Sequence, residues 1–224
     1  MPCQAKKYEA ARPEFAPGGI KDVDYVITTR ELVRLLHEAG INLANREDEE
    51  YDSPLGESTG AGVIFGVTGG VLEAALRSVH TMLTGKNLAD DAINFRAVRG
   101  LDGVKEAKVE VAPGITVNVA VASGLGNTRK VLDMIRKDRS RFQAIEIMAC
   151  PGGCINGGGQ PFIHDGNRAE VLRRRMEGLY AEDNGKQIRL SHENPDIKKL
   201  YEEFLGTPGS EKAHHLLHTV YHEK

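Results

Sequence analysis

Two of the three cysteines lie four residues apart, in the segment EIMACPGGCINGGGQP (residues 146–161). Pro151 interrupts any helix here, and five glycines within eight positions add no side-chain packing surface. Because glycine costs conformational entropy, such a run usually serves a backbone that must approach another group closely. Cys3 lies at the other end of the chain, in MPCQAKKYE. A site that uses all three thiols must bring these two segments together.

Several kinds of site could use the C-x-x-x-C segment. A cysteine is often only a small buried hydrophobe, but the Pro-Gly-Gly between Cys150 and Cys154 disfavours that interpretation. Soft thiolates with nearby backbone N–H groups suit an iron–sulfur cluster. Zinc more often takes C-x-x-C, and no histidine lies near a second ligand pair. The glycines could also cradle a phosphate, but the P-loop lysine and Ser/Thr are missing. Spacing alone favours iron–sulfur and leaves the other sites open.

Composition restricts the classes of protein to consider. The formal net charge of −3 and the absence of a basic run argue against nucleic acid as the main partner. The apolar stretches AGVIFGV and ITVNVAVA are far too short to span a bilayer, and no signal peptide is recognisable at the start. An odd and small number of cysteines is typical of reduced thiols. We therefore expect a soluble protein in the cytoplasm, with no membrane span.

Strand-like and helix-like patterns alternate along the chain, which predicts an α/β fold with a mostly parallel sheet flanked by helices. Residues 1–20 and 42–60 read as irregular. For the helix that begins at TTRELV we expect Thr29 as N-cap and Gly40 as C-cap. The expected strands are residues 23–29, 104–112, 115–123 and 142–149, and the expected helices are residues 28–40, 68–85, 126–138, 168–183 and short pieces from 194 onward.

Two motifs resemble signatures of one family. MACPGGCINGGGQP is similar to the third signature of the iron-only hydrogenases, and MPCQAKKYE is similar to their second, M-P-C-x-x-K-x-x-E. IFGVTGGVLEAALR resembles the start of a helix in that family. The ending, with NPDIKKLYEEFLG and HHLLHTVY, resembles the hydrogenase small subunit. The resemblance implies part of a two-lobed catalytic domain over residues 1–190 and a small-subunit-like helical segment over residues 191–224.

The resemblance also implies roles for individual residues. Cys3, Cys150 and Cys154 would ligate a 4Fe-4S cubane, and Cys154 would bridge it to a diiron subcluster with CO, CN and dithiolate ligands, the two together forming the H-cluster. Lys6 would donate a hydrogen bond to a cyanide ligand, because an ammonium suits a buried anion. The side chains expected to shield or line the diiron site are Met1, Met148 and Phe65.

Two carboxylates have simpler interpretations. We expect Glu9 to be structural and not catalytic. Glu73 and Arg77 lie one helical turn apart, which predicts an ion pair.

The implied activity is the reversible reduction of protons to H2, with ferredoxin or NAD(P)H-linked subunits as electron partners. An earlier family signature, T-S-C-C-P-x-W, is absent, and the chain has no tryptophan. That signature would supply the fourth cubane ligand and a proton relay. We therefore expect a fragment, truncated before the second signature and inactive by itself, whose missing N-terminal part is a further partner. The alternatives are a hydrogenase-like iron–sulfur assembly protein without a diiron centre and a hydrogen-sensing homologue.

Overall fold

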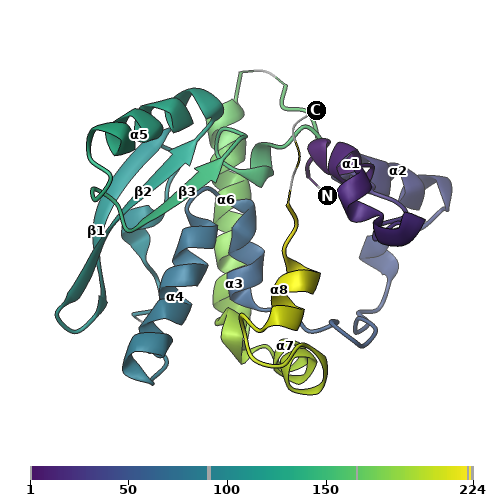
Figure 1. Cartoon of the computed structure of the whole chain (residues 1–224). Coiled ribbons are helices and arrows are strands. Elements are labelled where there is room, and N and C mark those ends of the chain that lie inside the picture. The colour runs from purple at the N-terminus through teal and green to yellow at the C-terminus, as the bar shows by residue number, and fades with distance from the viewer. Residues whose placement is uncertain (1, 90–91, 165, 221, 223–224) are drawn as a thin grey trace. The chain divides into compact units, whose positions relative to one another are not determined.

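The computed structural model describes residues 2–89, 92–164, 166–220 and 222 (Figure 1). The chain divides into two compact units. Unit 1 comprises Met1–Glu57, Gly157–Phe162 and Pro195–Lys224, and unit 2 comprises Ser58–Asn156 and Ile163–Asn194. Chain segments far apart in sequence therefore meet inside each unit.

Unit 2 is built on a three-stranded sheet in the order β1 (Val104–Ala112), β2 (Ile115–Ser123), β3 (Ala144–Met148). β1 and β2 form an antiparallel hairpin around Gly114, whose φ is 75°, whereas β2 and β3 run parallel. The predicted strands after residue 100 and the α/β class are confirmed, but the expectation of a mostly parallel sheet is wrong. A Pro-Gly connection is too short to cross over the sheet, so it forces the antiparallel arrangement.

Helices cover both faces of this sheet (Figure 1). On one face, α4 (Gly70–Thr84) packs Leu72 and Leu76 against Val119 and Val121. On the other, Val131 of α5 (Leu125–Lys137) packs against the alanines of β2 that alternate with those valines. A further core joins α6 (Arg168–Gly185) to η4 (Ile64–Gly66), which follows α3 (Gly60–Val63), and to η6 (Cys154–Asn156). The short helices η5 (Arg96–Val98) and η7 (Ser191–Glu193) complete unit 2.

All the regular elements described in unit 1 are helices. Its elements are α1 (Ala5–Ala10), η1 (Pro13–Phe15), η2 (Pro17–Gly19), α2 (Thr29–Glu38), η3 (Leu43–Asn45), α7 (Pro195–Leu200), η8 (Tyr201–Leu205) and α8 (Glu211–Leu217). The expectation that residues 1–20 are irregular is wrong, because α1 forms directly after Cys3. The expected strand over residues 23–29 is also absent, since unit 1 has no described strand with which it could pair.

The start of α2 corrects another expectation. Thr28, and not Thr29, is the N-cap: its hydroxyl accepts from the Glu31 N–H at 3.2 Å, and the Glu31 carboxylate accepts from the Thr28 N–H at 2.8 Å. This reciprocal capping box fixes the first turn. Gly40, with φ 68°, lies one residue beyond the C-cap. None of the α2 residues is buried.

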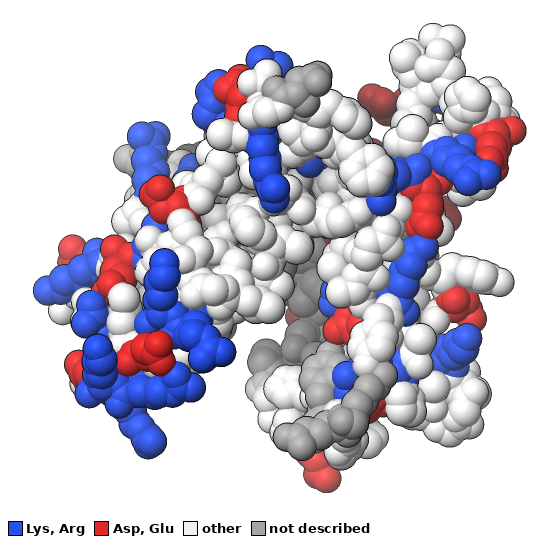
Figure 2. Space-filling view, turned by 90° about the horizontal axis from the view of Figure 1, so that it is seen from above, with Lys and Arg blue, Asp and Glu red and all other residues white. Residues whose placement is uncertain are grey.

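Charge is distributed unevenly over the face shown in Figure 2. In Figure 2, Lys and Arg side chains gather on the side that carries α5, whose sequence contributes Arg129, Lys130, Arg136 and Lys137. The chain as a whole is nevertheless slightly acidic.

Among the described helices, none is long and apolar enough to cross a membrane.

Candidate iron–sulfur site

The cysteine loop (residues 150–154) follows directly from the end of β3. The Met148 carbonyl accepts from the Gly124 N–H at 2.7 Å, which ties this strand end to the loop after β2. The Ser123 hydroxyl accepts from the Gly152 N–H at 2.6 Å. Gly152 and Gly153 have φ values of 88° and 95°, in the left-handed region that favours glycine. The sheet thus positions Cys150 and Cys154 on a sharply folded backbone.

The cysteine loop packs on the glycine turn (residues 66–70), which leads into α4. The Thr68 N–H donates to the Gly152 carbonyl at 3.2 Å. A Cβ on Gly153 would lie 2.6 Å from the Thr68 nitrogen and 2.9 Å from the Gly66 carbonyl oxygen. The close backbone approach that the sequence predicted is therefore confirmed for this half of the glycine run, and it is an approach to another part of the chain.

The other glycines approach the segment that carries Cys3, within unit 1. The Gly159 N–H donates to the Pro2 carbonyl at 2.9 Å, and a Cβ on Gly158 would lie 3.4 Å from the Gln4 side chain. Both residues that flank Cys3 therefore contact the glycines shortly after Cys154. Arg30 contacts the same glycines: its guanidinium donates to the Gly158 carbonyl at 2.9 Å, and its backbone N–H donates to the Gly159 carbonyl at 3.2 Å.

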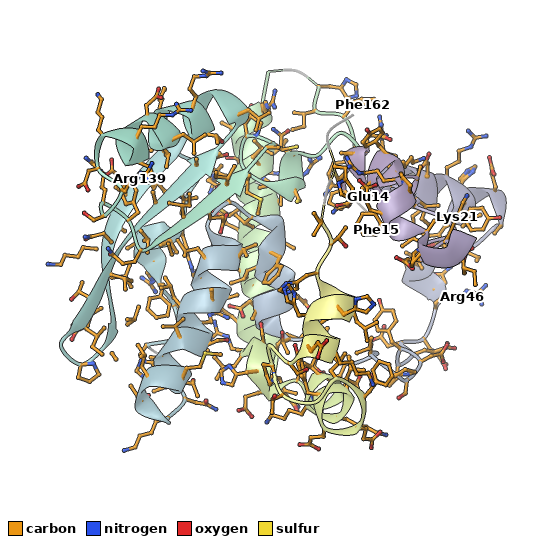
Figure 3. The ribbon with its side chains drawn as sticks, in the orientation of Figure 1. Glu14, Phe15, Lys21, Arg46, Arg139 and Phe162 are labelled. Atoms are coloured by element: carbon orange, nitrogen blue, oxygen red, sulfur yellow. The ribbon has the colours of Figure 1, made fainter. Side chains whose placement is uncertain are left out.

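An aromatic ring supports Arg30 in this arrangement. Its guanidinium lies 4.0 Å from the ring centroid of Phe162, which is labelled in Figure 3. A guanidinium over a ring face is favourable, and the planar group keeps its hydrogen-bond donors available. Arg30 therefore links α2, the glycine run and Phe162 inside unit 1.

The other predicted site residues fall into both units. Phe65, on η4, is 45% exposed, and Met148, at the end of β3, is half-buried. Lys6 lies on α1 and pairs with Glu9, and the structural role expected for Glu9 stays a prediction. Met1 lies outside the described residues.

The three cysteines have the chemistry of a cluster site. None of them forms a disulfide, and each is half-buried. Cysteine thiolates are soft ligands that suit an iron–sulfur centre, and the loop that carries Cys150 and Cys154 has no room for a side chain at Gly153. Within the described ranges, no three His, Cys, Asp or Glu side chains are gathered as a metal site. Cys3 belongs to unit 1, and Cys150 and Cys154 belong to unit 2, so their convergence stays a prediction.

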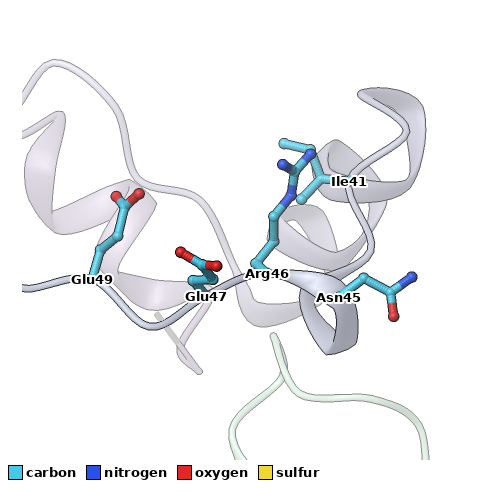
Figure 4. Close-up of a pocket in the computed structure, with 5 residues that line it drawn as sticks. All are labelled: Ile41, Asn45, Arg46, Glu47 and Glu49. Atoms are coloured by element: carbon cyan, nitrogen blue, oxygen red, sulfur yellow. The ribbon is translucent and has the colours of Figure 1, made fainter.

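A pocket elsewhere has a different lining. A surface pocket of about 500 Å³ in unit 1 is lined by Ile41, Asn45, Arg46, Glu47 and Glu49 (Figure 4). It contains none of the cysteines and none of the residues that the sequence singled out. The candidate site is therefore built from the cysteine segments.

Sequence reasoning missed two side chains that position the cysteine loop. Ser123, 2% exposed, holds Gly152 as described above. Glu146, 7% exposed, accepts from the backbone N–H groups of Gly69 at 2.5 Å and Leu72 at 2.7 Å. The available signal was a carboxylate inside the apolar run AIEIM, where a charged side chain is rarely buried without a partner.

Two family models match separate regions of the chain. Residues 1–158 match the model of the iron only hydrogenase large subunit, C-terminal domain, and residues 169–224 match the iron hydrogenase small subunit. The chain belongs to the iron-only hydrogenase family.

Individual hydrogenases are similar over the whole chain. The NADP-reducing hydrogenase subunit HndD of Solidesulfovibrio fructosivorans is 56% identical over 224 residues, which are 100% of this chain and 37% of that protein. Iron hydrogenase 1 of Clostridium pasteurianum is 44% identical, covering 99% of this chain and 38% of that one. Structures of the [FeFe]-hydrogenase HydA1 of Chlamydomonas reinhardtii superpose with a TM-score of 0.76 at 40% identity, covering 99% of this chain and 61% of theirs.

A second group of relatives is more distant. Protein NAR1 of Arabidopsis thaliana is 32% identical, covering 99% of this chain and 49% of that protein. The cytosolic iron-sulfur assembly component 3 of Rattus norvegicus is 35% identical, covering 99% and 46%. This chain is therefore more similar to the hydrogenases than to these proteins.

Proposed function

We propose that this chain is the cluster-holding part of a hydrogenase that catalyses the reversible reduction of protons to H2. The observation that carries the proposal is the position of the glycine run around Cys154. Its first half packs on the glycine turn of unit 2, and its second half contacts both neighbours of Cys3 in unit 1. Convergence of the three thiols on one cluster is part of the proposal.

Each predicted residue has a task in this proposal. Cys3, Cys150 and Cys154 hold a 4Fe-4S cubane as thiolates, and Cys154 also holds the diiron subcluster. When bound, the H-cluster supplies the electron relay and the iron at which hydrogen reacts. Lys6 donates a hydrogen bond to an anionic ligand of the diiron part. Phe65 and Met148 exclude water from it, with Met1 expected beside them.

The electron partner and the remaining polypeptide belong to the proposal too. The chain spans less than two fifths of the two hydrogenases compared above, so the complete enzyme would contain further segments. We infer an electron partner such as ferredoxin or an NAD(P)H-linked subunit, the latter supported by the NADP-reducing relative. We also infer a cytoplasmic location. The fourth cubane ligand and the proton relay would come from a segment outside this chain.

Anaerobic reconstitution with iron and sulfide tests the cluster. We expect the chain to bind a 4Fe-4S cluster with a labile iron, measured by iron and sulfide content and by electron paramagnetic resonance after reduction. Cys154→Ser should lose the cluster, whereas Glu9→Gln should keep it. Cluster content in Cys154→Ser equal to that of the unsubstituted chain would reject the ligand set.

The assembly-protein alternative makes a different prediction. After incubation of the reconstituted chain with a synthetic diiron subcluster, a hydrogenase-type site should show infrared bands of bound CO and CN. Lys6→Ala should shift or weaken the cyanide bands, because its ammonium would be a direct donor. A chain that holds the cubane but never retains these ligands would favour the alternative. H2 evolution is expected only when the missing segment is also supplied.

A further inference from the structure

Glu146, on β3, caps the N-terminus of α4, although the two elements are far apart in the sequence. The N-cap of α4 is Gly69, with φ 91° and no side chain that could accept from the first turn. Instead, the Glu146 carboxylate accepts from the N–H groups of Gly69 and Leu72. A carboxylate at a helix N-terminus satisfies donors that would otherwise lack a partner and interacts favourably with the helix dipole. Glu146 therefore holds the glycine turn against β3.

The same turn supports the cysteine loop. Thr68, next to Gly69, donates its N–H to the Gly152 carbonyl, and Gly153 has no room for a Cβ against the turn. Glu146 lies on β3, and Cys150 follows it by four residues, just beyond the end of that strand. The cysteine loop is thus linked to Glu146 twice, once along the chain and once through the glycine turn.

The ionisable groups near Glu146 lie on β1, α6 and α4. Lys105 of β1 is electrostatically coupled to it and donates to the carbonyls of Val98 and Gly100, at 2.8 Å each. Burial raises the pKa of the Tyr180 phenol on α6, and the charge of Glu146 also acts to raise it. On α4, Glu73 is fully buried and paired with Arg77 and with Arg99, which lies just after η5. On β2, the residue paired with Glu146 is the apolar Val121.

Burial dominates the environment of this carboxylate. It raises the pKa of Glu146 above its usual value, although the bonds from the Leu72 and Gly69 N–H groups and the charge of Lys105 act in the opposite direction. A buried charge is poorly screened by solvent, so it acts over a longer range than a surface charge.

We propose that Glu146 is a positioning residue for the cluster that the cysteine loop would hold, and that its charge, with that of Lys105, sets the reduction potential of that cluster. This inference rests on the proposed function. Reduction adds negative charge beside the cysteine loop, and a fixed negative charge at Glu146 opposes it. Loss of that charge should therefore make reduction easier, and loss of the Lys105 charge should make it harder.

The test is a redox titration of the reconstituted cluster, followed by electron paramagnetic resonance with dithionite as reductant. Glu146→Gln should shift the midpoint potential to more positive values, and Lys105→Met should shift it to more negative values. Glu146→Asp keeps the charge but shortens the reach to Gly69, so it separates charge from position. Glu106→Gln is the matched control, because Glu106 lies exposed on β1 beside Arg141.

The pH profile gives a second readout that a purely structural role would not change. The potential of the unsubstituted chain should rise as pH falls through the titration of Glu146, because one proton bound there offsets part of the added electron's charge. Glu146→Gln should lack this rise. Unchanged potentials and pH profiles in Glu146→Gln and Lys105→Met, with normal cluster content, would overturn the inference and leave the proposed function intact.

Two further outcomes are decisive. If Glu146→Gln takes up no cluster, the potential of Lys105→Met tests the inference instead. Lys105 donates its hydrogen bonds to the carbonyls of Val98 and Gly100, and not to the glycine turn or to a cysteine. A failure of Lys105→Met to move the potential to more negative values then overturns the inference. If the unsubstituted chain itself takes up no cluster, both the proposed function and this inference are rejected.

Discussion

Arg77 of α4 and Asp183 of α6 form a two-point ion pair, with N–O distances of 2.9 and 2.8 Å, and both side chains are fully buried. Arg77 also pairs with Glu73, as the sequence predicted, and Arg189 pairs with Asp183. Arg77 lies in the region matched by the large-subunit model and Asp183 in that matched by the small-subunit model. A buried charge network therefore joins the two regions within unit 2.

Breaking this pair should strongly destabilise unit 2. We expect Arg77→Met to lower the free energy of unfolding by ~3–5 kcal/mol, because it leaves the carboxylates of Glu73 and Asp183 buried with fewer partners. Urea denaturation followed by circular dichroism measures the loss. Arg173→Met is the matched control, since Arg173 pairs with Glu170 on the exposed side of α6 and should cost no more than ~1 kcal/mol. Equal losses in the two variants would contradict a special role for the buried pair.

Gly153→Ala should destabilise the chain and disturb the cysteine loop. The φ of 95° disfavours any side chain, and the added Cβ would lie 2.6 Å from the Thr68 nitrogen, so we expect a loss of ~2–4 kcal/mol. Gly126→Ala in α5 is the control. A Cβ there meets nothing within 4 Å, and alanine favours helix, so this variant should be neutral or slightly more stable. Thermal unfolding of both variants provides the measurement, and a harmless Gly153→Ala would contradict the tight packing.

Thr28→Ala should loosen the start of α2. Loss of the capping box costs about 1 kcal/mol. Hydrogen exchange of the amides in the first turn should become faster, because the Glu31 N–H loses its acceptor. Thr29→Ala is the comparison, since Thr29 is already inside the helix and should change exchange little. A larger effect at Thr29 would mean that the helix begins one residue later.

Lys105 should make stability depend on pH in the alkaline range. Burial lowers the pKa of Lys105 from 10.5 to about 8. Between these values the unfolded chain binds the proton and the folded chain does not, so the contribution of this group to stability rises with pH. Below about pH 8 both states are protonated, and the folded state bears the cost of the buried charge.

Unfolding measured from pH 7 to 10.5 tests this dependence. Relative to the unsubstituted chain, Lys105→Met should lack the rise, whereas Lys108→Met, at an exposed position of the same strand, should keep it. Parallel pH curves for the unsubstituted chain and Lys105→Met would show that Lys105 titrates normally.

Local patterns in the sequence were sufficient for many elements. Residues 68–85 were predicted to be helical and contain α4, and the runs on either side of Pro113 and Gly114 were predicted to be strands and form β1 and β2. The same reasoning failed for residues 23–29. Their composition suits a strand, but a strand forms only beside a partner, and local composition carries no information about whether a partner is present.

The sequence by itself determined which groups the candidate site contains: three thiols, a lysine near Cys3 and glycines where the backbone must approach closely. Only the tertiary structure decided how these parts are held. Glu146 reaches Gly69 across 77 positions, and Ser123 reaches Gly152 across 29. Such contacts depend on the sheet register and on the packing of α4 against β3, which no short-range periodicity encodes. These contacts form because buried N–H groups require acceptors, and the fold supplies the acceptors from the strand that lies nearest.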